Sequence, residues 1–266
     1  MYIKTNKSTL FLTKDRDIEG TPLLFIHGFT GSSQSWNNIR REIDTPSIAL
    51  DIPGHNKSIF NNLSDNYYFK DFSNELYIAL TQIKVEKLHL CGYSLGGRLA
   101  ISFAAKYPDM IQSLLLESTS LGIADRVERE ERYQKDLNIS ISISENLNEF
   151  VKNWESNQLF QMQETRDEQE YEYQRQIRKS HNKEQLSNSL RIFSVGNMPY
   201  MLNQFQKFKF PITIINGKDD IQYIKEGRQM LNLNGNSKQY IINNASHNVH
   251  LENKEMYLDI FTSIYN

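Results

Sequence analysis

Short apolar runs alternate with longer helical patterns over the first 117 residues, and this alternation restricts the possible fold more than any other feature. The apolar runs are only a few residues long, which is typical of strands buried on both faces. Helices between such strands act as crossover connections, so the strands form a parallel sheet covered by helices. We predict strands at residues 23–26, 47–50, 87–91 and 111–116, and helices at 33–43, 68–83 and 95–106.

The alternation stops between about residue 118 and residue 199, where charged and amide side chains dominate. An insertion of about 80 residues is too long for a loop, so we expect a helical cap. Polar helices are predicted at 128–132 and 163–179, whereas residues 139–143 alternate like a short, isolated strand.

Strand and helix patterns resume after residue 199. The sequence therefore predicts an α/β core of residues 1–117 and 200–266, with a helical cap of residues 118–199 inserted after the fourth parallel strand. Ligands of such sheets bind at the carboxyl ends of the strands, which places the site beneath the cap. The late strands are predicted at 210–215 and 238–242, and the late helices at 223–231 and 251–265.

The motif Gly92-Tyr93-Ser94-Leu95-Gly96-Gly97 follows a predicted strand and opens a predicted helix. A sharp turn at this place holds a serine hydroxyl clear of its neighbours, and the flanking glycines remove side chains that would collide. We therefore predict that Ser94 is the reactive hydroxyl of the site.

Such a serine needs a histidine base, and the histidine needs a carboxylate that orients it. After a turn of this kind the chain order is serine, acid, histidine. Asp220 is preferred to Asp219 because the acid usually stands three residues after the glycine that ends its strand. His247 is preferred to His250 because it lies in the loop after the last strand. Ser94, Asp220 and His247 are thus the predicted catalytic triad.

The sheet, the serine turn and this chain order together predict an α/β-hydrolase fold, with a mostly parallel central sheet flanked by helices. In this architecture two backbone N–H groups form the oxyanion hole, one after the first buried strand and one after the nucleophile. The predicted donors are Phe29 and Leu95.

The other histidines are expected to have structural roles. His27 is expected to brace its loop, and His55 to belong to a structural turn, with contact to the ligand as the alternative. His89 lies in a predicted buried strand and is expected to be a core residue. His181 lies in the polar cap and is expected at the surface.

Several arginines are expected near the predicted site. Arg98 lies in the first turn of a helix, where the helix dipole disfavours a cation. A bound anion would offset that cost, and a salt bridge to a nearby carboxylate is the alternative. Arginines of the cap also share helix faces, and many glutamates lie among them. Spacing alone therefore does not show which of these arginines bind the ligand. They are Arg126, Arg129, Arg132, Arg175 and Arg178.

Composition and charge exclude several classes of protein. The net charge is −2 and the pI about 6.3, so the chain lacks the excess of basic residues typical of a nucleic-acid-binding protein.

We expect a cytoplasmic protein because neither a signal peptide nor an apolar run of roughly 18 residues is seen. The single cysteine, Cys91, is expected in the core. No metal-ligand cluster or phosphate-binding loop occurs, so we expect no metal and no cofactor. The oligomeric state is left open.

Several segments together resemble one family within the α/β hydrolases, the 2-succinyl-6-hydroxy-2,4-cyclohexadiene-1-carboxylate synthases of menaquinone biosynthesis. The resemblance is tightest in the core and thinner in the cap. The segments are 24–33, 51–55, 92–100, Glu117-Ser118-Thr119-Ser120, Asp136, 154–160, and Ser246-His247-Asn248 with Glu252. The resemblance implies a lyase that removes a ring proton from 2-succinyl-5-enolpyruvyl-6-hydroxy-3-cyclohexene-1-carboxylate and eliminates pyruvate.

This substrate is a small molecule with three carboxylates. By position, the resemblance implies that the triad acts by base chemistry rather than acylation. It also implies carboxylate-binding roles for Arg98, Arg132 and Arg178, and pocket-lining roles for Tyr93, Trp154 and Phe29.

One departure concerns the start of the cap, where Leu121-Gly122-Ile123 replaces the family's Pro-Gly-Leu. Because this changes the turn into the cap, Arg129 is an alternative to Arg132. Two other functions are weighed against the lyase. One is a serine hydrolase, either an esterase or a carbon–carbon bond hydrolase, that acts on a small carboxylated substrate. The other is a non-enzymatic binding protein, which would not need all three triad residues.

Overall fold

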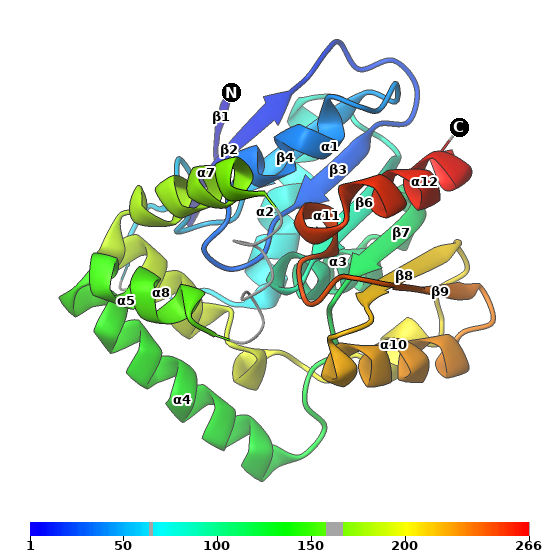
Figure 1. The fold of residues 1–266 in the computed structure, drawn as a ribbon. Coiled ribbons are helices and arrows are strands. Elements are labelled where there is room, and N and C mark those ends of the chain that lie inside the picture. The colour runs from blue at the N-terminus through cyan, green and yellow to red at the C-terminus, as the bar shows by residue number, and fades with distance from the viewer. Residues whose placement is uncertain (64–65, 158–166, 266) are drawn as a thin grey trace.

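A computed structural model describes residues 1–63, 66–157 and 167–265 (Figure 1). Its described strands form one sheet in the order β1-β2-β4-β3-β6-β7-β8-β9, with β5 paired to β2. The pairs from β4 through β3, β6, β7 and β8 to β9 are parallel, so the predicted α/β-hydrolase fold is confirmed. The strands are β1 (Tyr2–Lys4), β2 (Ser8–Lys14), β3 (Leu23–Ile26), β4 (Ser47–Asp51), β5 (Ile59–Phe60), β6 (Leu88–Tyr93), β7 (Ile111–Glu117), β8 (Ile212–Gly217) and β9 (Ser237–Ile242).

The edge formed by β1, β2 and β5 is antiparallel and was not predicted. Along β2 buried residues alternate with half-buried ones, because only one face of this strand packs on the core. Polar side chains therefore interrupt its apolar pattern, unlike the fully buried residues of β3.

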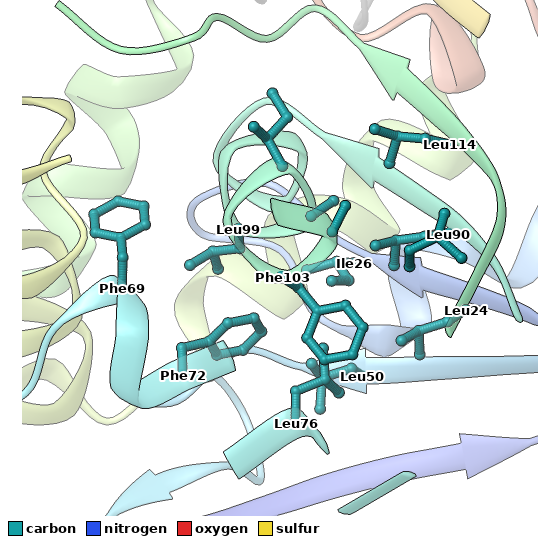
Figure 2. Packing of buried hydrophobic residues seen from close by; sticks show 14 of the residues in the cluster. Leu24, Ile26, Leu50, Phe69, Phe72, Leu76, Leu90, Leu99, Phe103 and Leu114 are labelled. Carbon is teal, nitrogen blue, oxygen red and sulfur yellow. The ribbon is translucent and has the colours of Figure 1, made fainter. Parts of the chain in front are cut away.

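Helices cover both faces of the sheet, and successive side chains of β3 point alternately to one face and the other. Leu24 and Ile26 pack in the cluster that contains α2 and α3 (Figure 2). Leu23 and Phe25 point to the opposite face, where α1 and α12 lie. The helices are α1 (Asn37–Arg40), α2 (Phe69–Gln82), α3 (Leu95–Lys106), α4 (Arg126–Glu145), α5 (Leu147–Glu155), α7 (Glu168–Lys179), α8 (Lys183–Ile192), α9 (Leu202–Phe205), α10 (Ile221–Leu233), α11 (Val249–Glu252) and α12 (Lys254–Tyr265).

Four described α-helices, α4, α5, α7 and α8, lie within residues 118–199, the segment that we propose as the cap. In Figure 1, α4, α5 and α8 lie together at the lower left, away from β6 to β9. They share a small apolar cluster that includes Ile143, Phe150 and Leu186, and Phe29 of the core packs against it. The first four residues of the helix predicted at 163–179 and the last three of segment 154–160 lie outside the described residues.

The strand-like pattern at residues 139–143 is wrong as a prediction, since these residues lie within α4. The hydroxyls of Ser140 and Ser142 donate to the carbonyls of Leu137 and Ile139 in their own helix. The serines therefore satisfy their hydrogen bonds locally, and Ile143 is buried against the cap. Among the helices described, none is long and apolar enough to cross a membrane.

Candidate active site

Ser94 occupies a sharp turn between β6 and α3. Its backbone has φ 50° and ψ −108°, a strained conformation for a residue with a side chain. The turn requires close packing of backbone, because a Cβ on Gly96 would lie 2.2 Å from the carbonyl oxygen of Ile26. The Ser94 N–H donates to the carbonyl of Glu117 at 2.8 Å, which ties the turn to the end of β7. The hydroxyl is therefore held in one place by the sheet itself.

Ser94, His247 and Asp220 are hydrogen-bonded in that order. Ser94 Oγ lies 3.0 Å from His247 Nε2, and His247 Nδ1 lies 2.7 Å from Asp220 Oδ2. His247 and Asp220 are buried, whereas the side chain of Asp219 is exposed. The structure thus places Asp220, the preferred candidate, against the histidine. Asp220 also caps α10, since its Oδ1 accepts the N–H of Tyr223.

His250, the alternative base, faces a different carboxylate. Its Nδ1 lies 2.7 Å from Glu117 Oε2, and both side chains are buried. The ring of Tyr93 packs against both histidines, with centroids 5.4 Å from His247 and 5.2 Å from His250. Burial raises the pKa of Tyr93 well above its ordinary value, so this phenol stays neutral.

Ser94 lies in the wall of a cavity of about 400 Å³ between the core and the cap. Phe29, Leu95 and Tyr93 line the cavity on the core side, and Trp154 and Asp136 on the cap side. As the first residue of α3, Leu95 has an N–H without an acceptor inside the helix. The two proposed oxyanion-hole residues therefore border the same space as the serine hydroxyl.

Arg98 lines this cavity and is buried, with only 8% of its surface exposed. Tyr223 lies near its guanidinium, but its buried Nε has no hydrogen-bond partner among the described residues. Burial lowers the pKa of Arg98 below its ordinary value, as expected for a desolvated cation. The salt bridge considered as an alternative is not found within the described part of the chain. Arg98 therefore presents a cation that an anion in the cavity would satisfy.

Arg132 lines the cavity from α4, and Arg129 is not among the lining residues. The Arg132 side chain is 44% exposed and pairs with Asp136 at 3.0 Å. Asp136 also accepts the hydroxyl of Ser194 at 2.7 Å, which fixes the carboxylate. Lys135, three residues after Arg132, adds another cation to the lining. The sequence reading missed Lys135, although its spacing from Arg132 was a usable signal.

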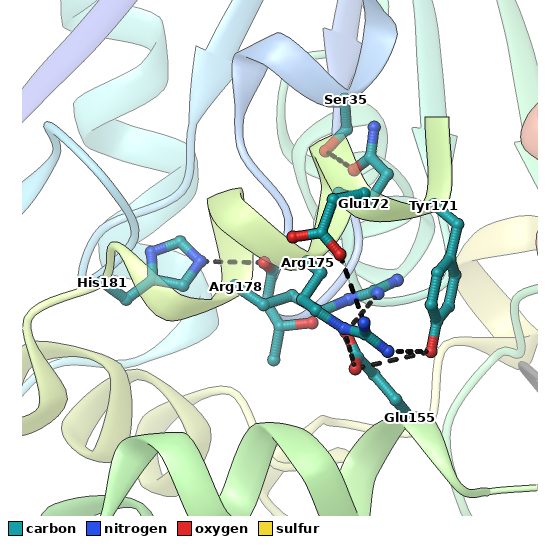
Figure 3. A network of polar contacts seen from close by, with 9 residues as sticks. Ser35, Glu155, Tyr171, Glu172, Arg175, Arg178 and His181 are labelled. Carbon is teal, nitrogen blue, oxygen red and sulfur yellow. Dashed lines mark hydrogen bonds and ion pairs between the residues drawn. The ribbon is translucent and has the colours of Figure 1, made fainter. Parts of the chain in front are cut away.

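Arg178 does not line the Ser94 cavity. It lies beside a smaller cavity of about 30 Å³ that Phe29 and Tyr93 also line. Figure 3 shows it paired with Glu155, whose carboxylate lies 2.8 Å from Arg178 Nη1 and 2.9 Å from Arg175 Nε. Sequence reasoning did not single out Glu155, because the pair joins α5 to α7 across the cap.

The prediction that His181 lies at the surface is wrong. Its ring is buried, accepts the N–H of Asn56 at Nδ1 (2.9 Å) and lies 2.8 Å from the carbonyl of Thr30 at Nε2. His27 likewise braces two loops, with Nδ1 2.7 Å from the Gly28 carbonyl and Nε2 accepting the N–H of Ile52.

His55 packs against both of these rings, with centroids 5.0 Å from His27 and 5.4 Å from His181. It does not line the Ser94 cavity, in agreement with a structural turn. His89 is only partly buried, and its Nδ1 lies 2.7 Å from the hydroxyl of Ser113.

Because His27, His55 and His181 are buried together, we predict that the fold loses stability in acid. Burial lowers the pKa of His27 and of His181 from 6.5 to about 4, and that of His55 well below 6.5. Between pH 6.5 and 4 the unfolded chain binds more protons than the folded one, so the free energy of unfolding falls as the pH falls. The loss corresponds to roughly 3 kcal/mol for each histidine whose pKa reaches about 4.

Urea unfolding measured from pH 7 to pH 4 checks this prediction. The His181→Gln variant keeps a donor and an acceptor but cannot titrate, so its stability should depend less steeply on pH. Parallel curves for the variant and the parent would contradict the assignment of acid sensitivity to His181.

This chain is similar to known proteins over most of its length. A model of the alpha/beta hydrolase fold matches residues 21–254. A putative 2-succinyl-6-hydroxy-2,4-cyclohexadiene-1-carboxylate synthase from Bacillus subtilis (strain 168) is 32% identical over 87% of this chain and 85% of its own. The synthase of that name from Enterobacter sp. (strain 638) is 27% identical over 87% of this chain and 86% of its own.

Solved structures agree with these relatives. MenH from S. aureus superposes with a TM-score of 0.88 at 27% identity and covers 97% of both chains. A thermophilic esterase from Thermogutta terrifontis has a TM-score of 0.84 at 18% identity, covering 99% of this chain and 97% of its own. At that identity the esterase shares the fold alone.

Proposed function

The chain belongs to the 2-succinyl-6-hydroxy-2,4-cyclohexadiene-1-carboxylate synthase family of α/β hydrolases, and from this premise we propose that it eliminates pyruvate from 2-succinyl-5-enolpyruvyl-6-hydroxy-3-cyclohexene-1-carboxylate. The reaction is a carbon–oxygen lyase step of menaquinone biosynthesis. Action on a small polycarboxylate, without nucleic acid and in the cytoplasm, is part of the proposal.

The observation that carries the proposal is a buried cation beside a serine triad. Arg98 and Ser94 line one cavity, and the Arg98 Nε has no partner among the described residues. Burying a cation is costly unless an opposite charge reaches it. A substrate with three carboxylates supplies that charge, and Arg132 and Lys135 lie at the same cavity for the others. An uncharged ester would offer these cations no carboxylate to bind.

The geometry supports a proton abstraction. Within 3.0 Å of Ser94 Oγ, His247 Nε2 can take the hydroxyl proton, while Asp220 orients the ring and stabilises its charge. Ser94 Oγ then removes the proton from the ring carbon that bears the succinyl group. This proton is acidic because the carbon is adjacent to a ketone.

The electrons of that C–H bond form a new double bond in the ring, and the existing ring double bond shifts by one position. The C–O bond to the enolpyruvyl group breaks, and the leaving enolate takes up a proton to become pyruvate. Phe29 and Leu95 line the cavity. We propose that their N–H groups stabilise the negative charge on the ketone oxygen.

The second candidate is a serine hydrolase of a small carboxylated substrate. It is kept because a hydroxyl hydrogen-bonded to a histidine is also the arrangement needed for acylation.

Parallel assays of elimination and of p-nitrophenyl butyrate hydrolysis separate the two functions. We expect kcat/KM for elimination to exceed that for the ester by at least about 100-fold, because the ester leaves the buried cation unpaired. Faster turnover of the ester would favour the hydrolase.

A further inference from the structure

A second buried pair of acid and histidine lies behind the triad. Glu117 is the last residue of β7 and is fully buried, and His250 in α11 is 1% exposed. The Glu117 carboxylate accepts the backbone N–H of His250 at 3.1 Å, and its Oε2 lies 2.7 Å from His250 Nδ1. Neither residue lines the Ser94 cavity, so neither touches a substrate bound there.

Glu117 connects two parts of the triad that are far apart in sequence. Its backbone carbonyl accepts the N–H of Ser94 at 2.8 Å. Its carboxylate holds His250, which stands three residues after His247. One residue at the end of a rigid strand is therefore bonded to the nucleophile turn and to the histidine loop.

The packing around His250 leaves the histidine loop little freedom. Trp36 stacks on His250 with centroids 4.1 Å apart and planes at 19°. The Tyr93 ring packs against both His250 and His247, with centroids 5.2 Å and 5.4 Å away. At the other end of the loop, the Glu252 carboxylate accepts the N–H of Ser246. Movement of His250 would therefore be transmitted to His247.

We infer that Glu117 and His250 are positioning residues that hold His247 Nε2 within hydrogen-bond distance of Ser94 Oγ. A charge-assisted hydrogen bond in a buried site is short and directional, so it restrains the loop more than an amide contact would. A misplacement of about 1 Å at a catalytic group can cost about 100-fold in rate. The inference rests on the proposed catalytic role of Ser94 and His247, and not on the identity of the substrate.

The Glu117→Gln variant tests the inference, because the amide keeps the shape but offers a single acceptor oxygen. We expect kcat and the rate of Ser94 labelling by a fluorophosphonate to fall about 10- to 100-fold, with KM changed less than about twofold. The low-field NMR proton between His247 Nδ1 and Asp220 should also shift. Thermal unfolding of each variant records its stability.

Glu75→Gln is the matched control. Glu75 is a buried glutamate of α2 that accepts hydrogen bonds from the hydroxyls of Tyr67 and Ser8, away from the triad. Its loss should lower stability and leave labelling unchanged. If Glu117→Gln lowers stability but labels at the parental rate, Glu117 is only structural and the inference fails.

If Glu117→Gln does not fold, two variants of His250 test the positioning role instead. His250→Asn keeps a donor near the position of Nδ1 and should retain most of the labelling rate, whereas His250→Leu should lose it. Equal labelling of these two variants would overturn the inference. A parent that is labelled but releases no pyruvate would contradict the proposed function alone, because labelling does not use the substrate.

Discussion

Replacement of Ser94 with alanine should lower kcat/KM for pyruvate elimination by about 10⁴-fold or more. The triad acts as a unit, so removing its hydroxyl removes the proton acceptor that His247 and Asp220 activate. Substrate binding should persist, because the cations of the cavity are untouched. Steady-state assays of pyruvate release give the loss in rate, and calorimetric titration of Ser94→Ala gives the binding.

A loss of less than about tenfold for Ser94→Ala would contradict the role of the Ser94 hydroxyl as the group that removes the ring proton. The carbonyl contact of Glu117 to the Ser94 backbone does not depend on the hydroxyl, so the variant should keep its fold. Thermal unfolding of the variant checks that point.

Replacement of Arg98 with alanine should lower kcat/KM for elimination roughly 10- to 150-fold. A hydrogen bond to a charged group contributes about 1.5–3 kcal/mol, and the buried Arg98 has an Nε without a partner in the described part of the chain with which to make one. Arg132→Ala should cost less, because that side chain is 44% exposed and already paired with Asp136.

Arg191→Ala is the control for the arginine series. Arg191 lies on α8, is exposed and does not line the cavity, so its loss should change the rate little. If Arg98→Ala eliminates pyruvate at the parental rate with an intact fold, the polycarboxylate site is wrong and the hydrolase becomes the better explanation.

The parallel core was predictable because its signals are local. Strands such as β3 and β6 are short apolar runs, and the glycines around Ser94 mark a turn that few other residues could form. The family prediction, which rested on the segments around these strands, is confirmed by the named relatives.

What could not be predicted depends on contacts between distant segments. His181 is buried because the cap brings it against Thr30 and Asn56, more than 100 residues earlier. Glu117 meets His250 across 133 residues, and no pattern near either one indicates the pairing. Arg98 could be placed on a helix, but the lack of a partner for its Nε within the described ranges is a property of the folded cavity.

The most direct test of the proposed function is pyruvate release from the purified enolpyruvyl substrate. We expect one pyruvate for each substrate consumed, together with the absorbance of the conjugated cyclohexadiene product, and loss of both in Ser94→Ala. Consumption of the substrate without pyruvate, or equal pyruvate release by the parent and Ser94→Ala, would contradict the proposed function.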